Sequence, residues 1–427
     1  MILDRKQSPD YKDIAAVSLL KPEHKTLANG LDLFYINSGE AELVRVEVIF
    51  NLDSWNASQP LDALATFKLL DDGTATKSSA EIASEIDFYG SFFQVSVQPD
   101  IATITLYSLR KYLEQSLNVV REMLTEAIFP QHELDTFIQN NIQRLQVDHQ
   151  KTSYLANRQF YQAIFGNTNK YGYNETEDDL RNMGRVQLLA HYAQYISNEN
   201  AFILVSGKVT EQDLAVIEKV LGESDWRSTS IPPNAEITFS PDANRQLFVE
   251  KKDAVQSSIR IGKTIISKPH ADYPALQLLN TILGGYFGSR LMANIREDKG
   301  YTYGIQSVLA SQKNQGFFFI GTDVGSDVSQ ATVTEIFKEI KRLKEEPVGA
   351  EELSLVRNYL LGSFQSSIEN AFSYAEKFKS VYLYKMGYDY YDRYFEAVNT
   401  TSAARLQELA NLYLDEDSLY TVIAGKK

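Results

Sequence analysis

An arginine and a tyrosine stand seven residues apart in a glycine-rich stretch of the second half of the chain. The stretch reads GGYFGSRLMANIREDKGYTYGI, from Gly284 to Ile305, and the two residues are Arg296 and Tyr303. A guanidinium and a phenol both donate hydrogen bonds, yet no obvious nucleophile or metal ligand stands beside them. The structural alternative is that Arg296 pairs with Glu297 or Asp298 on the surface and that Tyr303 packs in a sheet.

The histidines do not form a recognisable metal site. No two of the five lie three or four positions apart, the spacing at which two ligands share one face of a helix: His24, His132, His149, His191 and His270. The chain has no cysteine, which excludes a thiolate zinc site, a cysteine nucleophile and a disulfide framework. The residues themselves therefore predict no independent catalytic metal.

The glycines at the start of the stretch do not fit a nucleotide site. The dinucleotide fingerprint needs a strand before its glycines, whereas the preceding YPALQLLNTIL has apolar residues at helical spacing. We expect Gly284 and Gly285 to end a helix through a left-handed residue, and Ser289 to cap the next helix. The functional alternative is that these glycines let a substrate backbone pass close by.

Length and charge limit the possible architectures and partners. A chain of 427 residues exceeds the size of one ordinary core, so two domains are expected. The net charge of -14 disfavours nucleic acid and anionic membranes as main partners. No apolar run is long enough to span a membrane, and the charged beginning of the chain does not resemble a signal peptide. A cytoplasmic location is expected.

The chain contains an internal repeat. Two apolar strands followed by Gly-Lys end at Gly207 and Gly425, 218 positions apart, and two helix stops at Pro130 and Pro347 are 217 positions apart. Two landmarks with nearly one offset indicate two copies of one unit. The polar segment 225–245 contains the join.

The repeat predicts a first half-unit at residues 1–228, with an extra N-terminal arm at residues 1–25, and a second at 229–427. Alternating patterns predict strands at 31–36, 44–50, 92–98 and 101–108, each with one face on a core. Helical patterns are expected at 61–70 and at 78–90, the latter capped by Ser78 or Ser79 ahead of Glu81. The predicted fold class is α+β, with two homologous half-units, each a mostly antiparallel sheet with helices on one face.

The whole stretch from Gly284 to Ile305 resembles the signature of the carboxy-terminal half-unit of the insulinase/pitrilysin zinc metallopeptidases, which include the two-subunit processing peptidases. The repeat and the Asn-Gly-Leu opening at residues 29–31 agree with that family over nearly the whole chain. The resemblance implies a clamshell of two similar half-units, and two such chains that close around a chamber for peptides. It also implies that Arg296 and Tyr303 act on a substrate held by a zinc ion in the opposite half-unit.

The zinc motif of the family, His-x-x-Glu-His, is absent here. Aligned on Gly73 and Thr74, its ligand positions carry Leu64 and Lys68, and its general base is Phe67. Leucine and phenylalanine have no donor atoms, and an ammonium repels a dication. The helix that carries the third ligand in relatives has no glutamate after Glu133. No metal or other cofactor is expected in this chain.

The resemblance therefore predicts the zinc-less, arginine- and tyrosine-bearing subunit of a heterodimeric metallopeptidase. The partner would carry His-x-x-Glu-His and the zinc, the substrates would be peptides, and Arg296, Gly284 and Gly285 would bind them. The N-terminal arm would pack on the partner, the alternative being that it packs on its own domain. Two other interpretations stay open: an inert scaffold like the core subunits of respiratory complexes, and a homodimer in isolation.

Overall fold

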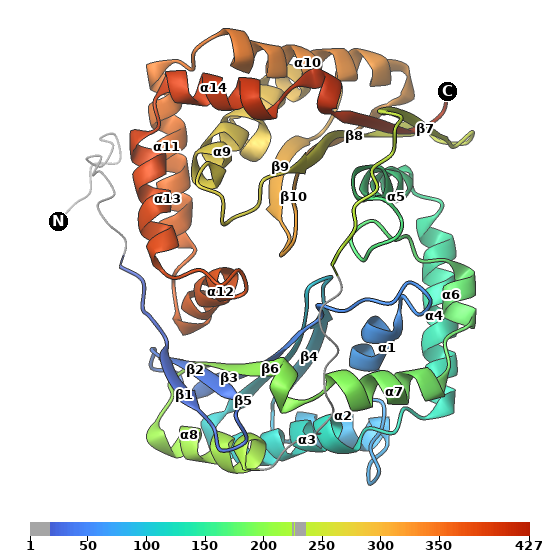
Figure 1. Ribbon diagram of the computed structural model, residues 1–427, viewed down its shortest axis with the longest axis vertical. Coiled ribbons are helices and arrows are strands. Elements are labelled where there is room, and N and C mark those ends of the chain that lie inside the picture. The colour runs from blue at the N-terminus through green and yellow to red at the C-terminus, as the bar shows by residue number, and fades with distance from the viewer. Residues whose placement is uncertain (1–17, 224–225, 227–235) are drawn as a thin grey trace, which may run out of the picture.

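The computed structural model describes residues 18–223, 226 and 236–427 and contains two β-sheets (Figure 1). The first sheet has six strands in the order β1-β2-β6-β3-β5-β4 and the second has five in the order β7-β11-β8-β10-β9. The strands of the first sheet are β1 (Glu23–Thr26), β2 (Asp32–Asn37), β3 (Leu43–Asn51), β4 (Phe92–Val97), β5 (Ile101–Leu109) and β6 (Ala201–Gly207). Those of the second are β7 (Gln246–Glu250), β8 (Gln256–Ile265), β9 (Ile305–Ser311), β10 (Gly316–Gly325) and β11 (Tyr420–Gly425).

Helices cover both sheets. Those of the part that precedes residue 224 are α1 (Asp62–Lys68), α2 (Ser79–Phe88), α3 (Leu113–Glu126), α4 (Gln131–Asp148), α5 (Thr152–Phe165), α6 (Glu177–Arg181), α7 (Arg185–Tyr195) and α8 (Glu211–Ile217). The later ones are α9 (Tyr273–Asn280), α10 (Ser329–Glu345), α11 (Ala350–Ser366), α12 (Ala371–Tyr382), α13 (Asp389–Thr400) and α14 (Ala403–Tyr413). Wider, π-type turns form the segments Glu218–Gly222, Thr281–Gly285 and Met292–Asp298.

The two sheets share one topology. In the first, β6 is parallel to β2 and antiparallel to β3; in the second, β11 is parallel to β7 and antiparallel to β8. The remaining pairs are antiparallel, so the predicted α+β class with mostly antiparallel sheets is confirmed. The proposed boundary between residues 228 and 229 lies outside the described residues and stays a prediction.

Several local elements begin and end where the sequence indicates. Helix α2 follows Ser78, whose side chain accepts from the Glu81 amide while the Glu81 carboxylate accepts from the Ser78 amide. This reciprocal pair is the predicted capping box. Helix α4 starts directly after Pro130, and α11 starts shortly after Pro347.

Each sheet is also covered by a helix from the other half of the chain. Helix α5 packs on β8 and β11, whereas α12 packs on β2 and β6 (Figure 1). The apolar contact under α12 joins Phe378 to Phe34 and Phe202, and the contact under α5 joins Phe165 to Phe317. Strand β3 was expected to bury one face, but because α12 covers the other, Arg45, Glu47 and Ile49 are buried too.

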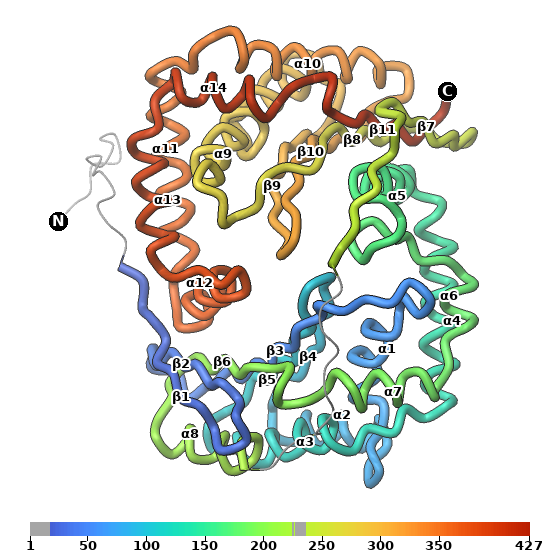
Figure 2. Tube along the Cα trace, viewed as in Figure 1, coloured from blue at the N-terminus to red at the C-terminus, as the bar shows by residue number. Residues whose placement is uncertain are grey.

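A hairpin tip joins the second sheet to the first half. The turn between β9 and β10 reaches toward β4 and α1 (Figure 2), where Lys313 Nζ lies 2.6 Å from Asp53 and its backbone N–H donates to Asp100 at 2.8 Å. The Asp100 carboxylate also accepts from the Tyr171 hydroxyl and pairs with Lys170 at 2.8 Å. Asp100 thus connects both halves through one nearly buried carboxylate.

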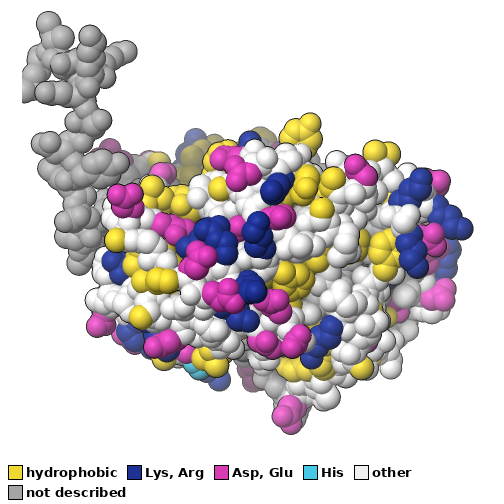
Figure 3. All heavy atoms as spheres, turned by 90° about the horizontal axis from the view of Figure 1, so that it is seen from above, with side chains coloured by type: hydrophobic (Ala, Val, Ile, Leu, Met, Phe, Trp, Pro, Cys, Tyr) yellow, Lys and Arg dark blue, Asp and Glu magenta, His cyan; other side chains and the backbone are white. Residues whose placement is uncertain are grey.

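The outer face above α10 and α14 mixes acidic, basic and apolar side chains (Figure 3). Ion pairs along α10, such as Lys341 with Glu345 and Arg342 with Glu346, account for part of this mixture. In the described ranges 18–223, 226 and 236–427, none of the helices has the length and apolar character of a membrane span. The described part of the N-terminal arm contacts its own chain, where Leu20 accepts a hydrogen bond from the Tyr388 hydroxyl; residues 1–17 lie outside the described residues.

Asp100→Asn should lower the free energy of unfolding by about 3 kcal/mol, because it leaves Lys170, whose side chain is only 5% exposed, without a countercharge. Urea unfolding measures the change. Asp389→Asn is the matched control, since Asp389 pairs with Arg393 on the surface and its loss should cost less than about 1 kcal/mol. Equally small changes in the free energy of unfolding for both variants would contradict a stabilising role of Asp100.

Candidate functional site

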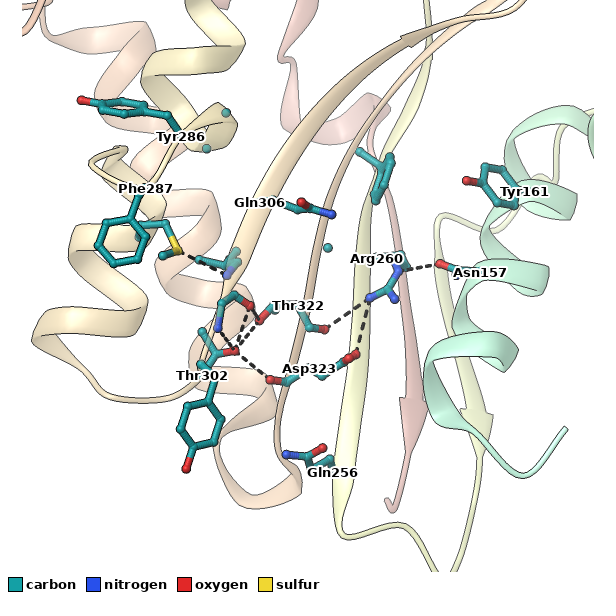
Figure 4. Close-up of a pocket in the computed structure, with 18 residues that line it drawn as sticks. Asn157, Tyr161, Gln256, Arg260, Tyr286, Phe287, Thr302, Gln306, Thr322 and Asp323 are labelled. Carbon is teal, nitrogen blue, oxygen red and sulfur yellow. Dashed lines mark hydrogen bonds and ion pairs between the residues drawn. The ribbon is translucent and has the colours of Figure 1, made fainter. Parts of the chain in front are cut away.

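A cavity of about 800 Å³ lies between the second sheet and helix α5 (Figure 4). Strands β8, β9 and β10 form its floor, and Asn157 and Tyr161 of α5 form one wall. The opposite wall is the segment that holds Gly284, Gly285 and Phe287. Because α5 belongs to the first half of the chain, both halves build this cavity.

Gly284 brings the wall close to the sheet. A Cβ at this position would lie 2.6 Å from the Ser307 amide nitrogen of β9, so only glycine permits the approach. Gly285 is exposed, and the nearest atom to a Cβ at this position would lie 3.2 Å away. The expectation of a left-handed helix end is wrong, since neither glycine has a positive φ and the helix instead widens into π-type turns. Ser289 does not cap either, because its hydroxyl is buried without a partner.

Tyr303 projects from the cavity rim with 95% of its surface exposed. Its backbone neighbours are fixed to β10: the Thr302 hydroxyl lies 2.8 Å from the Asp323 carbonyl oxygen, and the Thr322 hydroxyl donates to the Gly304 carbonyl at 2.9 Å. The phenol hydroxyl itself has no hydrogen-bond partner within the described residues. The structural alternative, packing of Tyr303 in the sheet, is therefore not what the structure contains.

Arg296 lies beside the same wall. Its guanidinium carbon sits 4.3 Å from the centre of the Phe287 ring, and its Nη1 is buried without a hydrogen-bond partner. Across the ranges that the structure describes, Arg296 forms no ion pair, neither with Glu297 nor with Asp298. Tyr303, Gly284 and Gly285 thus share the cavity, and Arg296 touches it through Phe287 without lining it.

Two of the three positions of the absent zinc motif, Leu64 and Phe67, pack in the first core. Phe67 is fully buried in α1, with its ring 5.2 Å from that of Phe50. Leu64 packs against the same core, and the Lys68 ammonium donates to the Val95 carbonyl at 2.5 Å. In the described part of the chain no group of three or more potential ligands could hold a metal ion. These residues do not fit zinc.

Burial perturbs one titratable group in α1 and one in the neighbouring helix α7. It raises the pKa of the Asp62 carboxyl to about 6 and lowers the pKa of the His191 imidazole to about 4. Both residues line a smaller cavity of about 270 Å³ that also contains Trp55. The imidazole is therefore neutral at pH 7, and the Asp62 carboxylate is ionised there at an energetic cost.

Sequence reasoning missed several residues of the main cavity, among them Arg260. Arg260, in the middle of β8, is only 8% exposed and lies on the floor of the cavity. An arginine inside the otherwise uncharged strand sequence SSIRIG was the available signal, since a buried guanidinium needs partners.

Known proteins resemble this chain in both sequence and fold. The family model described as Peptidase M16 inactive domain matches residues 182–360, which include Gly284, Arg296 and Tyr303. A protein of Bacillus subtilis named "Uncharacterized zinc protease YmxG" is 22% identical over 405 residues, 93% of this chain and 97% of that protein. The "Probable inactive metalloprotease YmfF" of the same organism is 24% identical over 330 residues, 70% of this chain and 75% of that one.

The resemblance to the insulinase and pitrilysin peptidases predicted from the motif is confirmed, because residues 182–360 match a model of the M16 peptidases. That model is described as an inactive domain, and one relative is named a probable inactive metalloprotease.

Solved structures share the M16 fold. The crystal structure of a peptidase M16 inactive domain from Pseudomonas fluorescens covers 96% of this chain and 99% of its own, with a TM-score of 0.83 and 22% identity. A chain of complex III2 from Candida albicans matches 94% of this chain and 95% of its own length, with a TM-score of 0.75 and 14% identity. The periplasmic protease PqqL of Escherichia coli matches 99% of this chain but only 49% of its own, with a TM-score of 0.77 and 17% identity.

The purified chain should contain far less than one zinc per molecule at neutral pH, because Leu64, Phe67 and Lys68 cannot coordinate the ion. Elemental analysis after dialysis gives the ratio, and a sample treated with a chelator sets the baseline. A tightly bound, stoichiometric zinc would contradict the assignment.

Asp62→Asn should stabilise the protein at pH 7. The folded-state pKa of about 6 exceeds the ordinary value of 3.8, so between these pH values the folded state keeps a proton that the unfolded state releases. Stability therefore falls as the pH rises from about 4 to 6, and the loss is complete above 6. The expected gain at pH 7 is below about 1 kcal/mol, because solvent screens a half-exposed group.

Urea unfolding at pH 4 and pH 7 tests this expectation. The gain should shrink toward pH 4, and Asp87→Asn, at an exposed position of α2, should show no such trend. A stability gain of the same size at both pH values would show that it does not come from removing the ionised Asp62 carboxylate.

Proposed function

We propose that this chain is the zinc-less subunit of a two-chain M16 metallopeptidase. In this proposal Tyr303 donates to a peptide carbonyl held at the zinc site of a partner chain, and Arg296 assists it. The observation that carries the proposal is the free, 95% exposed phenol at the rim of an 800 Å³ cavity. The backbone beside Tyr303 is held in place, and its phenol oxygen has no hydrogen-bond partner within the described residues, so the hydroxyl is available to a ligand.

The chemistry requires a donor where negative charge develops. Peptide hydrolysis places that charge on the carbonyl oxygen, and one well-placed donor lowers the barrier by about 3 to 4 kcal/mol. Thr302 and Thr322 hold the backbone on both sides of Tyr303, which limits the positions that its hydroxyl can take. The zinc of the partner would supply the activated water, since no group of metal ligands exists among the residues that the structure describes.

Arg296 makes no hydrogen bond within the described residues. Its Nη1 is buried and unpaired, which is costly unless a ligand supplies an acceptor. The contact with Phe287, itself part of the cavity wall, holds the guanidinium near the space that a peptide would occupy. In this proposal Arg296 binds a substrate carbonyl, and Gly284 and Gly285 let the peptide backbone approach.

The size of PqqL supports an assembly of two such chains. The M16 fold of this chain corresponds to about half of that longer protease. A second chain of similar size would supply the missing half, with its zinc residues. Cytoplasmic location stays a prediction, as does assembly through the N-terminal arm.

The likeness to a chain of complex III2 favours a second candidate, an inert scaffold. A scaffold has no use for a free phenol at a cavity rim, so the behaviour of Tyr303 discriminates between the two candidates.

Tyr303→Phe should lower kcat of the reconstituted pair by about 10² to 10³, with little change in KM, because the lost hydrogen bond forms fully only in the transition state. Cleavage of a quenched fluorescent peptide measures both constants. Tyr301→Phe is the matched control, since it removes one hydroxyl from the same loop but at a side chain packed against the second core.

Arg296→Ala should raise KM about tenfold, because it removes a charged donor from the bound peptide. The chain without its partner should cleave nothing. Unchanged cleavage by the Tyr303→Phe, Arg296→Ala double variant would leave the scaffold as the function of this protein.

A further inference from the structure

We propose that Arg260 forms a subsite of the cavity that binds a carboxylate of the peptide substrate. The proposal rests on the proposed function, because it takes the cavity beside Tyr303 to be a peptide site, and it adds the chemical class of peptide that the site prefers. Its basis is a buried guanidinium whose hydrogen-bonding capacity the chain uses only in part.

Arg260 is held rigidly in the centre of the second sheet. Strand β8 places it opposite Gly321 of β10 and Val422 of β11. Burial lowers the pKa of this guanidinium, yet an arginine stays charged in proteins. The floor of the cavity therefore carries a fixed positive charge.

The partners of Arg260 within the chain are mostly neutral. Its Nε donates to the Asn157 side-chain oxygen at 2.7 Å, and its Nη1 donates to the carbonyls of Ile259 at 2.8 Å and Thr322 at 3.3 Å (Figure 4). Within the described residues Nη2 donates to no acceptor, and it is not sealed from solvent. One edge of the guanidinium is thus open toward the cavity.

The only carboxylate near Arg260 in the described part of the chain is a poor partner. Asp323 lies 3.7 Å from Nη1, beyond hydrogen-bond distance, and its side chain is 48% exposed. A buried charge of this kind is stabilised fully only by a close, hydrogen-bonded countercharge. A substrate carboxylate at Nη2 would supply one.

The first sheet also contains a buried arginine, Arg45, with which Arg260 can be compared. Arg45 occupies the corresponding face of β3 and is also buried, but it lies 2.9 Å from Glu47 and 3.0 Å from Glu376 and donates to the Phe372 carbonyl. Two carboxylates and a carbonyl complete its shell. Arg260 lacks such a shell and lines an open cavity, which distinguishes a ligand site from a structural arginine.

Two sources can provide the carboxylate: an aspartate or glutamate side chain within the peptide, or the C-terminal carboxylate of a short peptide. Both present two oxygens in a plane, the geometry that a guanidinium edge recognises. The net charge of -14 would repel acidic peptides from the rest of the surface, so any preference for them must arise from a local cation.

The test measures binding of three labelled, unstructured peptides to the full chain by fluorescence anisotropy. The first has an internal glutamate and an amidated end, the second has glutamine in its place, and the third is the glutamine peptide with a free C-terminal carboxylate. We expect one of the two carboxylate peptides to bind about tenfold more tightly than the amidated glutamine peptide. The peptide that binds more tightly shows whether the site prefers a side-chain or a C-terminal carboxylate.

Two variants of opposite effect make the test specific. Arg260→Lys keeps the charge but removes the guanidinium edge, so it should reduce the preference for the carboxylate peptide to less than threefold. Asp323→Asn removes the competing carboxylate at a half-exposed position and should increase the preference at least threefold. Because Asp323 is half exposed, this second variant stays informative even where a change at buried Arg260 disturbs folding.

Equal binding of all three peptides, or a preference that neither variant alters, would overturn the proposal. That outcome is separate from failure of the proposed function. Loss of turnover in Tyr303→Phe together with equal peptide affinities would refute the carboxylate subsite alone. Absence of binding by every peptide, with unchanged turnover in Tyr303→Phe, would refute both.

Discussion

Both sheets carry apolar side chains on their two faces, and a helix from the opposite half of the chain covers the second face of each. Phe34, Phe202 and Ile49 in the first sheet would be exposed without α12, as would Phe317 and Val422 in the second sheet without α5. Burying one such side chain contributes about 1.5 to 3 kcal/mol. Because each sheet has several such side chains, separating the two halves would cost a large free energy.

This exchange of helices also creates the site. Helix α5 crosses to the second sheet to bury Phe160 and Phe165, and its polar side then faces the cavity with Asn157 and Tyr161. The hairpin tip at Lys313 fixes the far end of β9, the strand that begins just after Tyr303. Packing that holds the halves together therefore also fixes the distance between the phenol and the opposite wall.

Local features of the chain were readable from its sequence, whereas its long-range arrangement was not. The capping box at Ser78 depends on four neighbouring residues, and the strand patterns depend on alternation, so both could be predicted. Periodicity does not say which sheet a helix covers, so the crossing of α5 and α12 was missed, and with it the burial of Glu47. Glycine is common both at left-handed helix ends and where two backbones approach closely, so the sequence alone does not tell which role Gly284 has. The nearby Ser307 amide shows that it is the close approach.

The two halves share a topology but differ in the surroundings of the buried arginine on the corresponding face of each sheet. In the first half Phe67 packs on Phe50, and Arg45 is surrounded by carboxylates, so neither is available to a ligand. In the second half the donors of Arg260 and Arg296 are left partly unpaired around one cavity. A buried donor without an acceptor costs about 1 to 3 kcal/mol, which the fold could avoid by closing the second half as it closes the first. In the function that we propose, the second half carries the chemistry, and peptide oxygens supply the missing acceptors.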